Sequence, residues 1–352
     1  MDVASASTPD AEFYLGPERF ERERRELIPC SWQLAAHREQ LATPGDYVAT
    51  TLGAEPIVLV RNAAGIAGFF NVCRHRAGPV AVGCGHGRRL VCRYHGWSYG
   101  LDGVLERAPE MQDVKNFDPA AIHLAPVAVA EWGPLVFARA DAGAQPFAEA
   151  FAEVRARCAR QPLDGMRYVM TQSFRVRANW KLYVDNYLEG YHIPAVHPGL
   201  NREIDYRSYQ TELGSNHAAQ VGRVNASTGS DAGRRFIART PDEEAIYLWV
   251  FPNLMLNIYQ GILQTNVVIP HGIDDTEVRF DWFALEPPAD ADTGKRFRDL
   301  VAFAEEIQAE DAAICEAVAR NVASRAYRPG RYSALRESGV HHFHALMRAT
   351  GR

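Results

Sequence analysis

Residues 71–100 read NVCRHRAGPVAVGCGHGRRLVCRYHGWSYG, and this stretch decides the fold of the first half of the chain. Cys73 and His75 form a C-x-H pair, and sixteen residues separate it from a second pair. Cys92 and His95 form that pair with C-x-x-H spacing. Two short loops that each offer a thiolate and an imidazole can close around a 2Fe-2S cluster, with both sulfurs on one iron. A zinc site is the alternative, but zinc fingers usually pair Cys with Cys and His with His, so the mixed pairs favour the iron cluster.

The sequence around this motif predicts a small all-β unit. Short apolar runs such as EPIVLVR (55–61) and GPLVFAR (133–139) are separated by Gly, Asn and Asp turns. Gly78, Gly85 and Gly96 suit tight loops whose backbone amides face the cluster sulfides. The arginines of the motif either form a docking rim for an acidic electron donor or belong to a solvated surface.

The second half of the chain predicts longer strands and helices. Strands are expected at 168–177, 245–251, 254–260, 263–270 and 276–285, and together they indicate a broad antiparallel sheet. A helix is expected over 179–192, and a long amphipathic helix over about 293–324. A further helix is expected near the N-terminus, over residues 12–30.

Residues 179–200, NWKLYVDNYLEGYHIPAVHPGL, contain a second group of candidate metal ligands. A mononuclear iron(II) that activates oxygen needs two imidazoles and one carboxylate on one face, with the opposite face open. His192 and His197 supply the imidazoles, although a spacing of five does not suit a straight helix. We expect Pro194 to end the helix, so that His197 returns to the metal from the following loop.

The third ligand is expected on the long C-terminal helix, where most carboxylates are ordinarily solvated. The candidates are Glu305, Glu306, Glu310, Asp311 and Glu316. The apolar stripe of this helix consists of Phe303, Ala304, Ile307, Ile314, Cys315 and Val318. Asp311 falls on that stripe, and a carboxylate buried there requires a compensating cation. We therefore select Asp311 as the third iron ligand.

Together, the two motifs resemble the oxygenase (alpha) component of Rieske non-haem iron oxygenases. The resemblance is carried by 71–100 with LDG (101–103), VDNYLEGYH (184–192), HPG (197–199), EDAAICEAV (310–318), SRAYRPGRYS (324–333) and FHAL (343–346). The later segments are similar to the branch that acts on carnitine, glycine betaine and choline. The resemblance implies an α+β fold with a helical segment (1–40) that packs on the catalytic domain, an all-β Rieske domain (41–145), and a catalytic helix-grip domain (146–352) with a broad antiparallel sheet and a long C-terminal helix.

The resemblance also implies how electrons reach the mononuclear iron. The Rieske cluster would be held by Cys73, His75, Cys92 and His95, and the iron by His192, His197 and Asp311. Glu189 would bridge His192 to a cluster histidine, His95, of the adjacent subunit in a homotrimer. A surface glutamate is the ordinary alternative. Because no Gly-rich dinucleotide fingerprint is present, NAD(P)H would act only through a separate flavin/2Fe-2S reductase, with O2 as co-substrate.

The hypothesis for function is a monooxygenase that hydroxylates or N-dealkylates a quaternary or tertiary amine. A trimethylammonium group favours aromatic faces, and the candidates for that contact are Tyr187, Tyr191, Phe251, Tyr259 and Trp282. One alternative keeps the same metals but hydroxylates or O-demethylates an aromatic acid. Another, from a different class, is a non-catalytic Rieske electron carrier.

Composition excludes several other classes. The net charge of −5 arises from 38 basic and 43 acidic residues that are well mixed, so no basic field indicates nucleic acid. No stretch approaches the roughly 18 apolar residues of a membrane span, and the N-terminus lacks an apolar signal core. We expect a cytoplasmic protein without a membrane partner.

Overall fold

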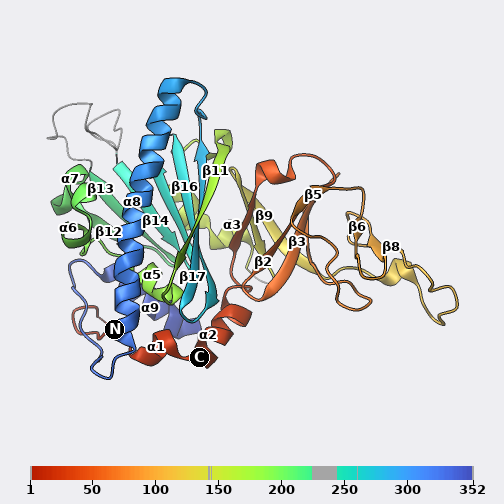
Figure 1. Ribbon diagram of the computed structural model, residues 1–352, viewed down its shortest axis with the longest axis horizontal. Helices are drawn as coiled ribbons and strands as arrows, with labels where there is room; N and C mark the ends of the chain where they lie inside the picture. Colours follow the sequence, from red (N-terminus) through yellow and green to blue (C-terminus); the bar gives the residue numbers. More distant parts are fainter. Residues whose placement is uncertain (1, 142, 144, 224–243, 260, 351–352) are drawn as a thin grey trace. The chain divides into compact units, whose positions relative to one another are not determined.

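A computed structural model of the chain describes residues 2–141, 143, 145–223, 244–259 and 261–350 (Figure 1). The chain divides into two compact units. One consists of Met1–Arg22 with Ala152–Arg352, and the other is Glu23–Phe151. In the part of the chain that the structure describes, no helix has both the length and the apolar character that crossing a membrane requires.

The Glu23–Phe151 unit is built on a seven-stranded antiparallel sheet with the order β1-β10-β9-β4-β3-β2-β5. Its strands are β1 (Gln33–His37), β2 (Asp46–Leu52), β3 (Glu55–Asn62), β4 (Gly65–Phe70), β5 (Cys84–His86), β9 (Pro126–Trp132) and β10 (Leu135–Arg139). A smaller sheet holds β6 (Leu90–Val91), β7 (Ser98–Tyr99) and β8 (Leu105–Arg107). The helical turns are η1 (Glu23–Leu27), η2 (Arg38–Leu41), η3 (Pro119–Ala121) and α3 (Phe147–Ala150).

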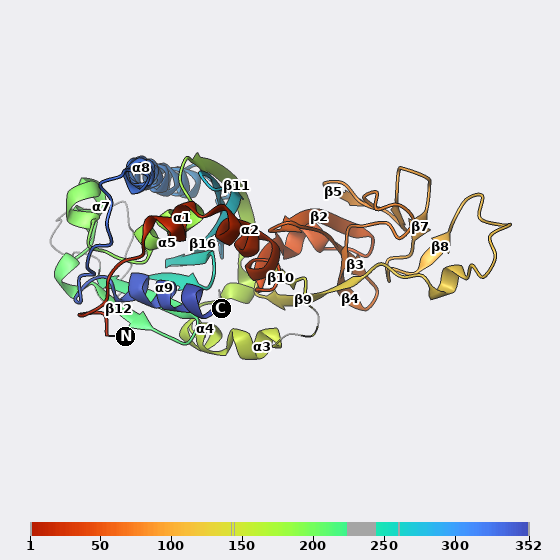
Figure 2. The ribbon, with the colours of Figure 1, turned by 90° about the horizontal axis from the view of Figure 1, so that it is seen from below.

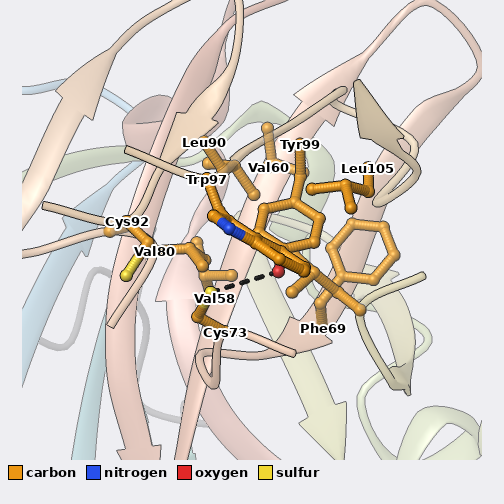
Figure 3. Close-up of a cluster of buried hydrophobic side chains, with 12 residues drawn as sticks. Val58, Val60, Phe69, Cys73, Val80, Leu90, Cys92, Trp97, Tyr99 and Leu105 are labelled. Atoms are coloured by element: carbon orange, nitrogen blue, oxygen red, sulfur yellow. Dashed lines mark hydrogen bonds between the residues drawn. The ribbon is translucent and has the colours of Figure 1, made fainter. Parts of the chain in front are cut away.

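Strand β3 explains how a continuous apolar run fits this sheet. Ile57 and Leu59 pack into a core on one face, whereas Val58 and Val60 pack into a core on the other. All four are fully buried. Because alternate strand residues face opposite sides, both faces of β3 are covered and no polar alternation is needed. The Val58 side of β3 carries the cysteine motif (Figure 3).

The other unit contains a second seven-stranded antiparallel sheet, with the order β11-β17-β16-β15-β14-β13-β12. Its strands are β11 (Arg167–Val176), β12 (Gln210–Leu213), β13 (His217–Arg223), β14 (Glu244–Val250), β15 (Leu254–Tyr259), β16 (Ile262–Gly272) and β17 (Asp275–Ala284). Its helices are α1 (Ala11–Leu15), α2 (Pro17–Arg22), α4 (Ala152–Arg157), η4 (Leu163–Gly165), α5 (Trp180–Tyr187), α6 (Ile193–Val196), α7 (Pro198–Glu203), η5 (Tyr206–Ser208), α8 (Ala291–Val322) and α9 (Ser338–Thr350). The α+β architecture expected from the sequence is confirmed.

Helix α8 crosses one face of this sheet, and α5 contacts both α8 and β16 (Figure 1). The start of α8 is fixed by a capping box, in which Asp290 accepts hydrogen bonds from the amides of Asp292 and Thr293. The buried side chains Val301, Gln308 and Val322 lie seven residues, or twice seven, apart along α8. That spacing keeps one row of α8 turned toward the sheet. The row determines which α8 residues reach the interior.

The N-terminal segment differs from the single helix expected over 12–30. Helix α1 ends at Leu15 and α2 begins at Pro17, because proline lacks the amide that a continuous helix would use. Phe13 and Tyr14 of α1 are buried in the same unit as α5, and the Tyr14 hydroxyl donates a hydrogen bond to Asp185 of α5 at 2.7 Å. Figure 2 shows α1 beside α5 and α9.

Candidate metal centre and substrate cavity

Three predicted ligands, His192, His197 and Asp311, meet in the unit that contains Ala152–Arg352. The two histidine Nε2 atoms lie 3.1 Å apart. The Asp311 Oδ1 atom lies 3.0 Å from Nε2 of His197 and 3.6 Å from Nε2 of His192. In a facial arrangement with metal–ligand bonds of about 2.1 Å, neighbouring ligand atoms lie roughly 3 Å apart. The spacing of these three atoms therefore fits one metal ion.

The local fold that presents the histidines differs from the expectation about Pro194. Helix α5 ends at Tyr187, well before the proline. His192 is the N-cap of the short helix α6, and Pro194 lies in the first turn of α6, where a missing amide costs nothing. His197 lies between α6 and α7. Pro194 therefore starts a helix rather than ending one, and the pair of short helices returns His197 to His192.

Gly190 allows the chain to turn between α5 and α6. A Cβ atom on Gly190 would lie 2.6 Å from Cε1 of Tyr209, a distance that side chains do not tolerate. Only glycine therefore permits this close approach, two residues before His192.

Each histidine of the triad is oriented by a second carboxylate. Oε1 of Glu189 lies 2.6 Å from Nδ1 of His192, and Oε2 of Glu310 lies 2.6 Å from Nδ1 of His197. Both Nε2 atoms consequently face the shared ligand position. Carboxylate–histidine–metal arrays of this kind fix the ring tautomer and orientation. The sequence indicated Glu189, but it placed Glu310 on a solvated face.

Asp311 is held by a neighbour from α5. The Asn186 side-chain amide donates to Asp311 Oδ1 at 2.5 Å. The predicted apolar stripe, on which the choice of Asp311 was based, is only partly buried, because Ile314 and Val318 are 36% and 39% exposed. Ile314 and Val318 lie beside the buried row of α8, which runs through Gln308, Cys315 and Val322 and is narrower than the six-residue pattern suggested.

Opposing effects set the protonation of the triad. Burial alone would lower the pKa of His192, but hydrogen bonds and charges from Asp311 and Glu189 outweigh burial and raise that pKa to about 9. The pKa of His197 is raised in the same way, against burial, by Asp311 and Glu310. Burial would raise the pKa of Asp311, but its bonds to both histidines lower it. The triad thus forms a network of charge-assisted hydrogen bonds that a cation can replace.

A cavity of about 100 Å³ opens on the triad. Its lining is mainly aromatic and carboxamide in character. The aromatic members are Tyr183, Tyr187, Tyr209, Tyr247, Phe280, Trp282 and Phe303, and the carboxamide members are Asn186, Gln220, Asn257, Gln264, Asn266 and Gln308. Aliphatic residues, including Leu200, Leu300 and Ile307, fill much of the remaining wall.

Of the five aromatic candidates, the structure places Tyr187 and Trp282 in this lining. Tyr191 and Phe251 are not among the described lining residues. Tyr191 is 58% exposed, and Phe251 packs on Trp249 with their ring centroids 6.0 Å apart. Tyr259 ends β15, and its side chain lies outside the described part of the chain.

The cysteine motif folds into two loops with the same backbone pattern. In the first, the Cys73 amide donates to the Gly78 carbonyl, and the Ala77 amide donates back to the Cys73 carbonyl. In the second, the Cys92 amide donates to the Trp97 carbonyl, and Gly96 donates back to Cys92. The equivalent residues Ala77 and Gly96 both have positive φ, 58° and 74°. Each loop therefore presents its cysteine from a matching turn.

The cysteine side chains of these loops are buried, whereas the imidazoles are exposed. Cys73 and Cys92 are 3% and 2% exposed. Burial raises the pKa of the Cys92 thiol, the amide of Tyr94 opposes that rise, and the adjacent Cys73 thiol adds to it. The rings of His75 and His95 lie with centroids 4.6 Å apart. The two sulfurs are thus on the protein side and the two imidazoles on the solvent side, as a mixed cluster requires.

Close contacts leave little free space beside the two sulfurs. A Cβ atom on Gly78 would lie 2.8 Å from Cys92 Sγ. The Tyr99 hydroxyl lies 3.2 Å from Cys73 Sγ and accepts a hydrogen bond from the Arg74 amide (Figure 3). Cys84 and His86 lie on the β5 edge, where His86 contacts Asp46 at 2.9 Å, apart from these loops.

A chain with paired cysteine–histidine loops in one unit and a triad of two histidines and one carboxylate in the other has the features of a Rieske oxygenase. Residues 163–350 match the catalytic domain of the ring-hydroxylating alpha subunit, and residues 31–118 match the Rieske 2Fe-2S domain. The chain belongs to this family of oxygenase alpha subunits. It is an oxygenase whose cofactors are a Rieske 2Fe-2S cluster and a mononuclear iron that works with O2.

The similar proteins include choline and carnitine monooxygenases. The chain is 33% identical to the chloroplastic choline monooxygenase of Arabidopsis thaliana, covering 99% of this chain and 83% of that protein. It is 30% identical to the carnitine monooxygenase oxygenase subunit of Escherichia coli, covering 97% and 93%. A solved quaternary ammonium Rieske monooxygenase in complex with L-carnitine is 26% identical, with a TM-score of 0.82 over 98% of this chain and 96% of that one.

Proposed function

We propose that this chain is the oxygenase component of a two-component monooxygenase that acts on a quaternary or tertiary amine of the betaine, carnitine or choline type. The reaction hydroxylates a carbon bonded to nitrogen and releases an aldehyde on N-dealkylation. The observation that carries this proposal is the aromatic cavity that opens on the triad. Aromatic faces attract an alkylammonium cation, and the names of the similar proteins point to the same substrate class.

We assign the mononuclear iron to His192, His197 and Asp311, and the cluster to Cys73, His75, Cys92 and His95. When bound, the iron activates O2 for C–H oxidation and the cluster supplies electrons. Glu189 and Glu310 accept hydrogen bonds from the Nδ1–H groups of His192 and His197. Each Nε2 lone pair is then directed at the shared metal position. The triad distances of 3.0–3.6 Å support this assignment.

The cavity walls position the amine. Trp282 is fully buried, and its indole NH donates to Gln172 at 3.1 Å, which fixes the ring plane. The Tyr187 hydroxyl donates to Asn257 at 2.7 Å, which fixes a second ring. Rings held in this way give the ammonium group a preformed surface and exclude water from the neighbouring C–H bond.

We further propose that Glu189 is the electron-transfer bridge between two copies of the chain in a homotrimer, with electrons from a separate flavin/2Fe-2S reductase. The contact of Glu189 with His192 Nδ1 supplies one side of the bridge. The exposed histidines of the cluster loops leave an imidazole available for the other side. A carboxylate between two imidazoles accepts a hydrogen bond from each.

Substrate screening tests the proposed function. The holoenzyme, reduced by a matching reductase and NADH, is supplied with choline, carnitine, glycine betaine or benzoate. We expect oxygen uptake to be matched by aldehyde formation with an amine. Hydroxylation or O-demethylation of benzoate-type acids, with no amine oxidised, would establish the aromatic-acid alternative instead.

Iron analysis separates the oxygenase from a pure electron carrier. We expect about three irons per chain, two in the cluster and one in the triad. His192→Ala should reduce this number to about two, keep the cluster spectrum and abolish turnover. A chain with only two irons, in which His192→Ala changes nothing, would be an electron carrier.

The bridge is tested by comparing two carboxylates that make the same contact. Glu189→Gln and Glu310→Gln each alter a 2.6 Å contact to a triad histidine, but only Glu189 is proposed to reach a second subunit. At equal iron occupancy, stopped-flow reoxidation of the reduced cluster should slow in Glu189→Gln alone. Equal slowing in both variants would show that Glu189 only orients His192. Light scattering should give the mass of three 39.2 kDa chains.

A further inference from the structure

Two buried polar atoms on the cavity wall have no hydrogen-bond partner among the residues that the structure describes. They are Oδ1 of Asn266 and Nε2 of Gln308. The two side chains are 3% and 2% exposed, and both line the cavity that opens on the triad. Buried polar atoms are nearly always paired, so unpaired atoms of cavity-lining residues indicate positions where a ligand or an ordered water supplies the partner.

The orientation of Gln308 is fixed by Tyr183. The Tyr183 hydroxyl donates to Gln308 Oε1 at 2.5 Å, and Tyr183 itself is buried. With its oxygen occupied, Gln308 has only its amide hydrogens to offer. Because Gln308 lies in the buried row of α8, together with Val301 and Cys315, it cannot turn toward solvent to satisfy them.

Asn266 lies on the aromatic face of the sheet. It pairs with Phe280 across β16 and β17, and two residues earlier Gln264 pairs with Trp282. All four residues line the cavity. Residues two apart on a strand share a face, so Asn266 stands in the same row as the rings proposed to hold the ammonium group.

The charges around the cavity limit what the ligand can carry. Among the described lining residues the ionisable acids and bases, tyrosines apart, are Glu189, His192, His197 and Asp311, all part of the metal centre. None of the described lining residues is a lysine or an arginine. A substrate carboxylate at this wall would therefore meet no cationic side chain among the described lining residues, and it would bring further acceptor oxygens to the unpaired Asn266 oxygen.

We infer that the substrate is an amino alcohol, with a hydroxyl end that accepts from Gln308 Nε2 and donates to Asn266 Oδ1. A hydroxyl is the smallest neutral group that both donates and accepts, whereas a carboxylate only accepts. This inference rests on the proposed amine oxidation and narrows it, because it favours choline-like substrates over betaines and carnitine. In this inference, Asn266 and Gln308 are the residues that determine the specificity of the cavity for a hydroxyl group.

Binding to the anaerobic holoenzyme tests the inference by calorimetry with three probes. Choline carries the hydroxyl, ethyltrimethylammonium lacks it, and glycine betaine replaces it with a carboxylate. We expect choline to bind at least about tenfold more tightly than either of the others, because a site built for a hydroxyl rejects analogues that leave its polar groups unpaired.

Variants assign the effect to the two side chains. Asn266→Leu and Gln308→Met should each reduce the ratio of the ethyltrimethylammonium Kd to the choline Kd toward one. Thr265→Val is the matched control, because Thr265 Oγ1 is also buried and unpaired but Thr265 is not among the described lining residues. It should leave the ratio unchanged. The Tm and the cluster absorption of each variant verify that it is folded.

The outcomes separate this inference from the proposed function. If glycine betaine binds more tightly than choline and is oxidised, the amine oxidation stands and the hydroxyl inference is overturned. If the Asn266 and Gln308 variants keep the wild-type ratio, the two atoms bind water rather than substrate, and the inference again fails. If no ammonium probe binds and only aromatic acids turn over, the proposed function itself is wrong.

Discussion

Replacing Glu310 by alanine tests whether the carboxylate that contacts His197 contributes to the affinity of the triad for its metal ion. The variant removes the 2.6 Å contact between Glu310 Oε2 and His197 Nδ1, and it leaves His197, which is 1% exposed, free to adopt the other tautomer. Loss of such an outer contact typically costs 10–100-fold in metal affinity. The Glu310 side chain is 31% exposed, against 13% for Glu189, so solvent screens its bond more strongly.

We therefore expect the lower end of that range for Glu310→Ala, about tenfold weaker binding, equivalent to about 1.4 kcal/mol. Anaerobic titration of Co(II) into protein that retains its cluster but lacks the mononuclear ion measures this affinity. Glu316→Gln is the control, because Glu316 lies on the same helix but bonds to Arg177. Wild-type affinity in Glu310→Ala, or an equal loss in Glu316→Gln, would refute the role of Glu310.

Three further predictions concern the cluster loops and the triad. Gly78→Ala should lose the cluster spectrum, because its Cβ would lie 2.8 Å from Cys92 Sγ, whereas Gly96→Ala should keep the spectrum at a cost of about 1–2 kcal/mol in unfolding free energy. Tyr99→Phe should lower the cluster midpoint potential in a redox titration, since it removes a hydroxyl 3.2 Å from a cysteine sulfur. In protein without the mononuclear ion, the raised pKa of His192, about 9, keeps the imidazole protonated at neutral pH. Co(II) affinity should therefore fall by up to about tenfold per pH unit below pH 9, and a constant affinity would contradict this reasoning.

The ligand residues could be predicted from the sequence because their chemistry is local. A cysteine and a histidine two or three residues apart can share one loop, and the loop geometry confirms that Cys73 and Cys92 begin equivalent turns. The long helix could also be predicted from the sequence, since α8 spans Ala291–Val322 against an expected 293–324. Periodicity and caps act over a few residues, within reach of a single sequence.

The path of the chain between the ligands was not predictable in the same way. Pro194 carries the same local restriction whether it ends one helix or begins another, because it tolerates the first turn and excludes the interior. In the structure the chain passes from α5 to α6 through Gly190, whose approach to Tyr209 leaves no room for a side chain. That contact joins residues nineteen positions apart, so no local pattern reveals it.

The cavity wall shows most clearly where sequence patterns fail. Strand β16 is buried on both faces, so Gln264, Thr265 and Asn266 are all interior residues, exposed by 2%, 0% and 3%. Alternation of polar and apolar residues normally tells which face a residue occupies, but a strand covered on both sides has no such alternation. Gln264 and Asn266 face the cavity, whereas Thr265 is not among its described lining residues. A shift of one residue in register would exchange these roles, so the register of β16 against β17 places Gln264 and Asn266, the latter proposed to select the substrate, on the cavity wall.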